Sequence, residues 1–503
     1  MIPSPGNAIA LSLAVPLVGF VAIWLAGRWP NLREAATLLT GVVLIALTLI
    51  VFAAVGEGAR PGYLLYTVVG GLPIAFQAEP LGAMFAVLAS VLWFVNSLYS
   101  IGYMRGHHEK HQTRFYMCFA IAIASAMGVA YAANLFTLFI FYEVLTLSTF
   151  PLVTHKGDEA AKQGGRVYLG ILMGTSIGLL LPAIVWVYSI AGTTDFTPGG
   201  VLAAPLSDAG PLPMILMGLF AFGIGKAALM PIHPWLPNAM VAPTPVSAFL
   251  HAVAVVKAGV FSVLKIAVYI FGVDFLGETG AATPFMWIAA GSILLASAIA
   301  MHKDNLKARL AYSTVSQLSY VTLGAMLATE MGVMGGAMQI AAHAAGKMTL
   351  FMCAGAIYVG AHKTLVSELR GLGPKMPFTF IAFFIGAMSI VGLPPLGGSW
   401  PKFLLMLGAA DAGQLAIIGV LIVSSLLNVV YLLSIPVQAF YLEPAGEGEK
   451  PQGSGAKAID WRNIEEAPLL CVIPPIITAL FALLLFIFAD PLYAYLTPIA
   501  EAR

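Results

Sequence analysis

The chain has 503 residues, of which 60% are hydrophobic and 9% are charged. A typical soluble domain is about half apolar and about one quarter charged, so this composition excludes a soluble globular protein and predicts an integral membrane protein. The formal net charge is +1, which gives no support for a nucleic-acid partner.

Long apolar runs predict fourteen membrane-spanning helices, because each crossing needs about 20 mostly apolar residues. The first run is as long as a spanning helix and lacks a preceding basic segment, so we interpret it as a helix rather than a cleaved signal. Residues 56–79 are too polar to span and are expected to form a short hairpin. The expected spans are 7–27, 35–55, 80–104, 114–132, 134–153, 167–191, 213–240, 244–271, 284–302, 308–328, 332–360, 377–410, 414–440 and 467–489.

Two of the expected helices, the seventh and the twelfth, are interrupted by proline and glycine. The seventh contains Pro231, Pro234 and Pro237, and the twelfth contains the run 392–398 followed by Pro401. Proline removes a backbone donor, and the freed groups are tolerated at membrane depth inside protein or along a wet cavity. Transporters with inverted repeats place such breaks at their ion paths. Two breaks five helices apart therefore predict an internal repeat.

The basic residues predict the orientation of the chain. With the N-terminus outside, 17 of the 24 Lys and Arg residues fall in inside loops, whereas Arg60 and Arg503 fall outside. The positive-inside rule therefore favours fourteen crossings of a bacterial inner membrane with both termini on the outside face. The polar stretch 443–466 is expected to be an inside linker.

Several ionisable residues fall within the expected helices, where a charge is costly and marks an ion path. Glu143 has apolar residues on both sides in the fifth helix, Lys226 lies just before the first break, and Lys402 follows the second. Lys257 and Lys265 are eight residues apart on the eighth helix, close to two turns, so they share a face.

Lysine, glutamate and histidine in this setting suit proton transfer. Burial disfavours the charged form of lysine and a nearby carboxylate favours it, so a buried Glu–Lys pair can switch the lysine between its two protonation states. Histidine can bridge such sites near neutral pH, and His343 and Lys347 are four residues apart on one helix face. We therefore expect a water-linked row of titratable groups at mid-membrane depth, formed by Glu143, Lys226, His251, Lys257, Lys307, His343, Lys347 and Lys402, with His233 and Lys265 as further candidates.

Three of these candidates have a structural alternative. Lys265 fits a snorkelling or ion-paired lysine, and Lys307 fits a positive-inside anchor near a helix end. His233, in the proline-rich break, fits a residue that holds the irregular backbone together. These alternatives stay open at the level of the sequence.

The run 225–251 (GKAALMPIHPWLPNAMVAPTPVSAFLH) resembles the signature of the antiporter-like membrane subunits. That family comprises the large membrane subunits of respiratory complex I, the D and A subunits of Mrp-type multisubunit Na⁺/H⁺ antiporters, and membrane-bound hydrogenase subunits. Supporting runs are 255–260 (VVKAGV), 306–320 (LKARLAYSTVSQLSY) and 392–398 (GLPPLGG). The likeness covers nearly the whole chain.

The resemblance implies an all-α polytopic fold of about fourteen helices, with two inverted five-helix repeats and broken helices 7 and 12. The first three helices and the hairpin would occupy 1–112, the first repeat 113–271, the second repeat 284–440, and a polar loop with the last helix 441–503.

The resemblance also implies roles for matching residues. Glu143 is similar to the family's fifth-helix glutamate, Lys226 to its partner, Lys257 to the central lysine and Lys402 to the terminal lysine. Lys307 and His343 or Lys347 fall where the family has its second-half linkers. One departure is Pro401 directly before the terminal lysine, which puts the geometry of that site in question.

The segment 255–260 looks closest to Mrp D subunits and hydrogenase-linked relatives. The resemblance thus implies a D-type subunit of a multisubunit antiporter that moves H⁺, and possibly Na⁺, beside other membrane subunits. The alternatives are a proton-pumping subunit of a redox complex and a membrane scaffold. The sequence carries no redox-cofactor motif, so we expect no cofactor and no enzymatic activity of the chain itself. The three cysteines are far apart, which favours buried small residues over disulfides or metal ligands: Cys118, Cys353 and Cys471.

Overall fold

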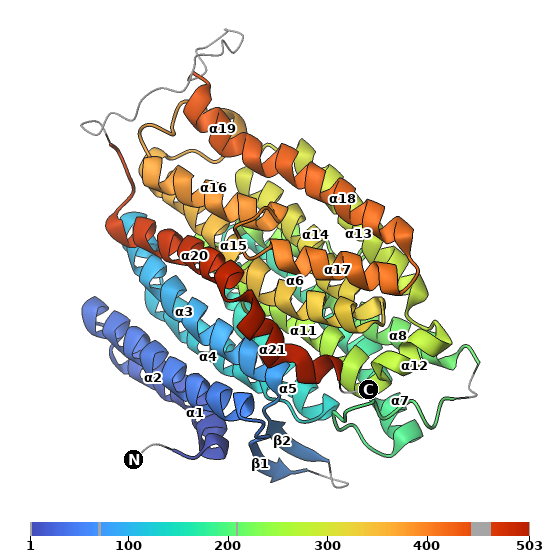
Figure 1. Cartoon of the computed structure of the whole chain (residues 1–503). Coiled ribbons are helices and arrows are strands. Elements are labelled where there is room, and N and C mark those ends of the chain that lie inside the picture. The colour runs from blue at the N-terminus through green and yellow to red at the C-terminus, as the bar shows by residue number, and fades with distance from the viewer. Residues whose placement is uncertain (1–2, 69–71, 208–209, 444–463, 502–503) are drawn as a thin grey trace.

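The computed structural model describes residues 3–68, 72–207, 210–443 and 464–501. The chain folds into a bundle of roughly parallel and antiparallel helices with one small β-hairpin at one end (Figure 1). In the described residues, eleven helices are long and apolar enough to cross a membrane. The predicted polytopic all-α class is therefore confirmed.

The N-terminal half forms its elements close to the expected bounds. Each of α1, α2 and α3 begins at or next to a proline, which suits the first helical turn because its N–H groups have no intrahelical partner. The elements are α1 (Pro5–Leu25), α2 (Pro30–Gly56), β1 (Gly62–Thr67), β2 (Pro73–Gln77), α3 (Pro80–Gly106), α4 (Gln112–Ala130), α5 (Leu135–Val153), α6 (Glu159–Thr175), η2 (Ser176–Leu180), α7 (Leu181–Ala191), α8 (Leu212–Gly223), η3 (Gly225–Ala227), α9 (Trp235–Asn238), η4 (Ala239–Val241), α10 (Thr244–Ala252), α11 (Val255–Ile266) and η5 (Ala267–Phe271).

The C-terminal half also follows the expected runs and adds short helices that sequence reasoning did not predict, α12 and α21. The elements are α12 (Val273–Thr279), α13 (Thr283–His302), α14 (Leu306–Met326), α15 (Glu330–Ala361), η6 (Val366–Leu369), α16 (Pro377–Val391), α17 (Ser399–Asp411), α18 (Leu415–Asn428), η7 (Val429–Leu433), α19 (Ser434–Tyr441), α20 (Leu469–Ile487) and α21 (Ala489–Ala500). Most of the expected inside linker, residues 444–463, lies outside the described residues.

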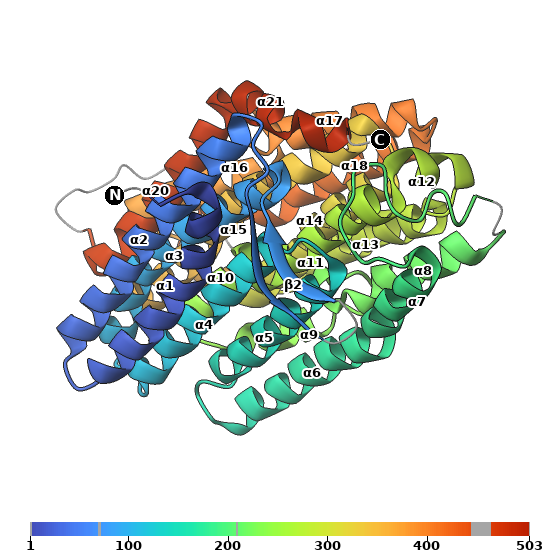
Figure 2. The same ribbon diagram turned by 90° about the horizontal axis from the view of Figure 1, so that it is seen from below.

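The core of the bundle is formed by the helices that carry the candidate residues. In the most apolar stretches of 244–271 and of α15 every residue is buried, and in that of α3 78% of the residues are buried. By contrast, α1 is 33% buried and lies with α2 at the periphery (Figure 2). Lysines on α11 and α15 therefore cannot reach a membrane surface by extending their side chains.

Both predicted breaks are present. The first follows Gly223, where η3 and a turn with Ala228 at φ 53° replace regular helix before α9. The second separates α16 from α17, and Gly392 ends α16 with φ 87°. Pro401 falls in the first turn of α17, where proline is tolerated because the N–H groups there have no helical acceptor.

The eighth expected helix, 244–271, is not continuous. Regular helix stops at Ala252 and resumes at Val255, and the intervening Val253 has φ −127° and ψ −61°. A π-helical turn, η5, then completes the span. No proline or glycine marks the interruption in the sequence, so apolar periodicity gave no signal for it.

The polar stretch after α2 forms the expected hairpin. β1 and β2 pair antiparallel, with Gly62 opposite Gln77. The main chain of Gly6 lies against Gly62, and Glu501 lines one cavity together with Arg60 and Glu79. Both described ends of the chain thus lie at this end of the bundle, which we call the hairpin face. The opposite end, which carries the α1–α2, α3–α4, α5–α6 and α13–α14 loops, is called the basic face.

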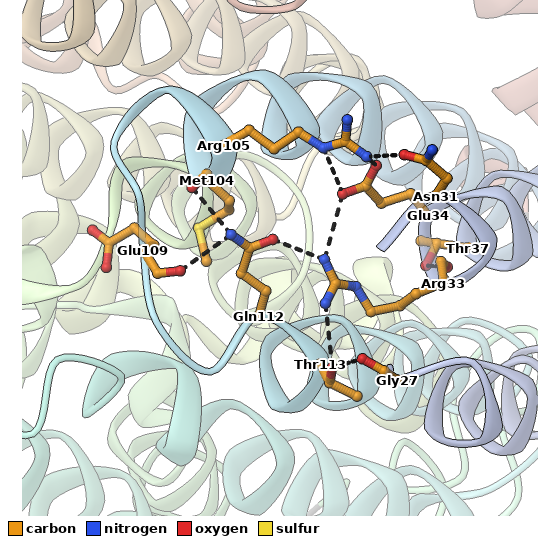
Figure 3. A network of polar contacts seen from close by, with 10 residues as sticks. All are labelled: Gly27, Asn31, Arg33, Glu34, Thr37, Met104, Arg105, Glu109, Gln112 and Thr113. Atoms are coloured by element: carbon orange, nitrogen blue, oxygen red, sulfur yellow. Dashed lines mark hydrogen bonds and ion pairs between the residues drawn. The ribbon is translucent and has the colours of Figure 1, made fainter. Parts of the chain in front are cut away.

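An ion cluster at the basic face, in which Arg33 and Glu34 are buried and Arg105 is partly exposed, holds α2 against α3 and α4. Glu34 accepts from Arg105 on α3 and pairs with Arg33 at 3.4 Å. Arg33 also donates to Gln112 at 2.8 Å and to Thr113 at 3.3 Å, at the start of α4 (Figure 3). We call Arg33, Glu34, Arg105 and Gln112 the N-terminal clamp.

Candidate ion pathway

Lys226 lies in the first break and is held by α5. Its ammonium nitrogen donates to the main-chain oxygen of Tyr142 at 2.8 Å and to the hydroxyl of Thr146 at 2.6 Å. The same nitrogen lies 3.1 Å from the centroid of the Tyr142 ring. Lys226 is completely buried, and these three contacts are all with uncharged groups.

Glu143 does not form the direct pair with Lys226 that the sequence predicted. Both carboxylate oxygens are buried and have no hydrogen-bond partner among the described residues. Successive helical residues point about 100° apart, so when the main chain and ring of Tyr142 face Lys226, the side chain of Glu143 points elsewhere. The two charges still interact electrostatically at longer range. A buried carboxylate without a donor is costly, so its oxygens are sites where water or a proton is needed.

Lys257 and His343 meet at the centre of the bundle. The ammonium nitrogen of Lys257 on α11 lies 2.6 Å from Nδ1 of His343 on α15, and both side chains are buried. An ammonium can donate to a neutral imidazole nitrogen, so one proton can be shared between the two residues. Within the described chain, Nε2 of His343 has no partner.

α11, the helix that carries Lys257, packs directly against the backbone of the first break. A Cβ added at Gly259 would overlap the main chain of Lys226 and Ala227. A glycine at this position of α11 therefore lets the helix that carries Lys257 approach the backbone of Lys226 directly.

Lys347, His251 and Lys307 lie between the central pair and the basic face. Lys347 donates to the oxygen of Leu310 at 3.4 Å, and Lys307 donates to the oxygen of Ala242 at 2.6 Å. His251 is completely buried, and neither ring nitrogen has a partner in the part of the chain that the structure describes. Its ring interacts electrostatically with both lysines.

Lys402 lies at the second break, as Lys226 lies at the first. Its nitrogen donates to the oxygen of Val391, the last residue of α16, at 2.7 Å and to the hydroxyl of Ser425 at 3.1 Å. The end of a helix leaves main-chain oxygens without an intrahelical donor, and Lys402 satisfies one of them. Its nitrogen also lies 5.0 Å from the centroid of the Tyr320 ring.

Lys265 differs from the other buried lysines because it has a carboxylate partner. Its nitrogen lies 3.3 Å from Glu79 and donates to the oxygen of Ala132 at 2.9 Å. Glu79 also caps α3 by accepting from the N–H groups of Leu81 and Gly82. The pair borders a cavity of about 420 Å³ at the hairpin face.

His233 remains apart from the row. Its ring is half-buried and lies 6.1 Å from the ring of Tyr312. Across the described residues, no group of three or more His, Cys, Asp or Glu side chains is placed to hold a metal ion.

Sequence reasoning missed the residues that hold the lysines. Tyr142 and Thr146 gave no signal, because hydroxyls in apolar helices are common and bond most often to their own helix. Glu79 carried a usable signal, since Pro80 marks an expected helix start and a negative charge directly before it is favoured by the helix dipole.

Comparison with known families matches most of the chain. Residues 132–428 match the family described as NADH:quinone oxidoreductase/Mrp antiporter, TM, and residues 67–116 match NADH-ubiquinone oxidoreductase (complex I), chain 5 N-terminus.

Curated relatives carry three kinds of name. NADH-quinone oxidoreductase subunit N of Desulforudis audaxviator is 30% identical, over 90% of this chain and 89% of the relative. The D subunit of the Na⁺/H⁺ antiporter of Alkalihalophilus pseudofirmus is 26% identical, over 85% of this chain and 83% of that protein. Hydrogenase-4 component B of Escherichia coli is 31% identical, but the match covers 65% of this chain and 49% of that protein.

Solved structures share the whole fold. A chain of the Mrp complex from Dietzia sp. superimposes with a TM-score of 0.84 at 23% identity, over 99% of this chain and 97% of that one. A chain of an archaeal membrane-bound sulfane sulfur reductase superimposes with a TM-score of 0.80 at 21% identity, over 98% of this chain and 97% of that one. Together with the family match, these likenesses show that the chain belongs to the NADH:quinone oxidoreductase/Mrp antiporter family of membrane proteins.

Proposed function

We propose that the chain is the D-type subunit of a multisubunit Na⁺/H⁺ antiporter and passes protons along its row of buried and partly buried residues. The row comprises Glu143, Lys226, Lys257, His251, Lys307, His343, Lys347 and Lys402. It would lie in a bacterial inner membrane beside other membrane subunits, with the hairpin face outside. The subunit would have no redox chemistry of its own.

One observation carries the proposal. Lys226, Lys257, Lys347 and Lys402 are each buried, and each donates to a neutral acceptor: a carbonyl, a hydroxyl or an imidazole nitrogen. A buried ammonium without a carboxylate partner is poorly stabilised, so its charged and neutral forms are close in free energy. A lysine in this state can both accept and release a proton.

The arrangement also orders the steps. A proton that enters near Glu143 would charge Lys226, and α11, which packs against the backbone of Lys226, carries the next lysine, Lys257. The Lys257–His343 contact would pass the charge between the two halves of the molecule, and Lys347 lies one turn from His343 on α15. Lys402 would then be the last buried lysine before release. Each move brings a positive charge near a neighbouring lysine, and the repulsion favours the next transfer.

We keep one alternative, a proton-pumping membrane subunit of a redox complex. The 30% identity to an NADH-quinone oxidoreductase subunit N over 90% of this chain supports it. Both functions use the same row and differ in what drives it. Similar folds alone do not separate them.

The test is cation/proton exchange in inverted vesicles from a host that lacks its own antiporters and expresses the whole operon. We expect wild-type vesicles to exchange Na⁺ for H⁺ without a redox donor, and Lys226→Ala vesicles to lose the exchange. Exchange that requires an electron donor would replace the antiporter assignment with the redox pump. Equal exchange by the variant would remove Lys226 from the path.

A further inference from the structure

A seam of polar side chains runs between α13, α14 and α18 and continues into η7. We call it the hydroxyl seam, and all its members are at most 1% exposed. On α14, Ser313 and Ser316 are at positions i and i+3, so both lie on one face of the helix. On α18 and η7, Asn428 follows Ser424 by four positions and Tyr431 follows Asn428 by three, so these also share a face. The members are Ser297, Ser313, Ser316, Ser424, Asn428 and Tyr431.

The seam is joined by side chain to side chain contacts. The hydroxyl of Ser297 lies 3.0 Å from that of Ser316 and 3.3 Å from that of Ser424, and either oxygen of each pair can be the donor. The hydroxyl of Tyr431 donates to Ser313 at 3.0 Å and also contacts Asn428.

These contacts are unusual for serines in membrane helices. A buried serine commonly donates back to the carbonyl of its own helix, as Ser97 and Ser262 do in this chain. In the described structure Ser297, Ser316 and Ser424 bond across helices instead. Hydroxyls joined in this way can reverse their donor and acceptor roles by rotating about one bond.

One end of the seam reaches Lys402. The lysine donates to Ser425. The hydroxyl of Tyr320 lies beside the side chains of both Ser425 and Ser424, so it connects this contact to the seam. At the other end, Tyr431 lies close to the basic face: Arg309 donates to its main-chain oxygen at 3.3 Å and to the main-chain oxygen of Lys303 at 2.7 Å. The seam thus spans the distance from the buried lysine to a half-exposed arginine.

One member of the seam has an unmet hydrogen bond. The Nδ2 of Asn428 has no partner among the described residues. Buried groups of this kind are the usual partners of internal water. Tyr431 itself lies in the π-helical turn η7, and such single turns occur frequently at functional sites.

We propose that the hydroxyl seam is a proton route between Lys402 and the basic face. The proposal rests on the proposed function, because it supplies a route to one of the lysines in the row. The ammonium of Lys402 gives one proton to Ser425 or to water beside it. Each following hydroxyl or water accepts one proton and releases another, so one proton moves along the seam and no other bond changes.

The test uses the whole complex in inverted vesicles with Tyr431→Phe, Ser297→Ala and Ser297→Thr. Tyr431→Phe keeps the ring and Ser297→Thr keeps the hydroxyl. We expect Tyr431→Phe and Ser297→Ala to lower exchange by at least about tenfold, which is less than the roughly hundredfold loss of a complete proton-transfer group because water can partly replace a hydroxyl, and Ser297→Thr to retain most of it. The matched control is Tyr99→Phe, which removes a buried hydroxyl that donates to Met352 at 3.0 Å, away from the seam.

Wild-type rates for Tyr431→Phe and Ser297→Ala would overturn the seam. Equal losses for Ser297→Ala and Ser297→Thr would also overturn it, because packing and not the hydroxyl would then matter. If the Tyr431→Phe complex fails to assemble while the Tyr99→Phe complex assembles, the Tyr431 hydroxyl has a structural role. That outcome would also overturn the seam as a proton route. If wild-type vesicles exchange only with a redox donor, the proposed antiporter function fails, and the variants are compared under that donor.

Discussion

At the scale of single residues, the partners of the buried lysines divide them into two kinds. Lys226, Lys257, Lys347 and Lys402 donate to neutral groups, whereas Lys265 is paired with Glu79. The contact between Lys265 and Glu79 joins α11 to the start of α3. The sequence placed Lys265 among the candidates for the row, and its geometry favours the ion-paired alternative.

This difference predicts opposite outcomes for one substitution. Lys265→Arg keeps the charge and the donors that bind Glu79, so exchange should stay within about twofold of wild type. Lys226→Arg keeps the charge but cannot release a proton, so exchange should be lost. Exchange in vesicles with matched amounts of assembled complex checks both, and loss of exchange with Lys265→Arg would return Lys265 to the pathway.

His155, in the loop between α5 and α6 at the basic face, predicts a pH dependence of stability. Burial, and next the charge of Arg114, lowers its pKa to about 4. The folded state therefore holds the neutral ring, while the unfolded chain binds a proton below a pKa of about 6.5. The neutral ring of His155 therefore makes its full contribution to the free energy of unfolding above pH 6.5. This contribution, on the order of 2 kcal/mol in total, is lost as the pH falls toward 4. Thermal unfolding across this window should show a shallower loss in His155→Gln than in wild type, and identical profiles would contradict the assignment.

At the scale of elements, the breaks and close approaches position the site. Prolines and glycines in the sequence were enough to predict the two breaks. Proline removes a backbone N–H donor and glycine allows backbone conformations that other residues avoid, so both interrupt a helix wherever they cluster. The interruption at Val253 was not predictable, because nothing in its residue types differs from a continuous helix.

Gly259 tests the close approach of α11 to the first break. Gly259→Ala adds a Cβ against the backbone of Lys226 and Ala227, which cannot move as a flexible side chain can. We expect a loss of about 1–3 kcal/mol in stability, typical of overpacking, together with reduced exchange. The control is Gly291→Ala in α13, where an added Cβ meets no atom within 4 Å. The measurement is the melting temperature of each purified variant. Equal melting temperatures for Gly259→Ala and Gly291→Ala would show that α11 does not pack tightly against the first break.

At the scale of the whole molecule, the peripheral helix α2 is held to the core by the N-terminal clamp. Glu34→Gln would leave Arg33 and Arg105 without their shared carboxylate, and we expect a loss of about 2 kcal/mol, reduced by the partial exposure of Arg105. Exchange per assembled complex should persist, because the clamp lies outside the row. Limited proteolysis of the α1–α2 loop should become faster, and unchanged cleavage would contradict a clamping role.

The sequence predicted the membrane class and the approximate bounds of most helices, because apolar length is a property of local segments. The candidate row remains a proposal. The sequence did not predict which atoms meet. Lys226 binds Tyr142, 84 residues away, and Lys257 binds His343, 86 residues away. The expected contact between Glu143 and Lys226 is absent for a local reason, the turn of about 100° between consecutive residues of α5. Such contacts depend on the rotation of each helix about its axis, which hydropathy does not fix.

The central claim is that the buried titratable groups carry protons, and Glu143→Gln tests it most directly. Neither carboxylate oxygen has a hydrogen-bond partner in the described structure, so the substitution removes a titratable group without removing a contact. The measurement is Na⁺-driven proton exchange by vesicles that contain equal amounts of assembled wild-type and variant complex. We predict that the variant loses at least about a hundredfold in rate, within the range seen for lost proton-transfer groups. A variant that exchanges at the wild-type rate would contradict the account, because the carboxylate would then have neither a structural nor a transport role.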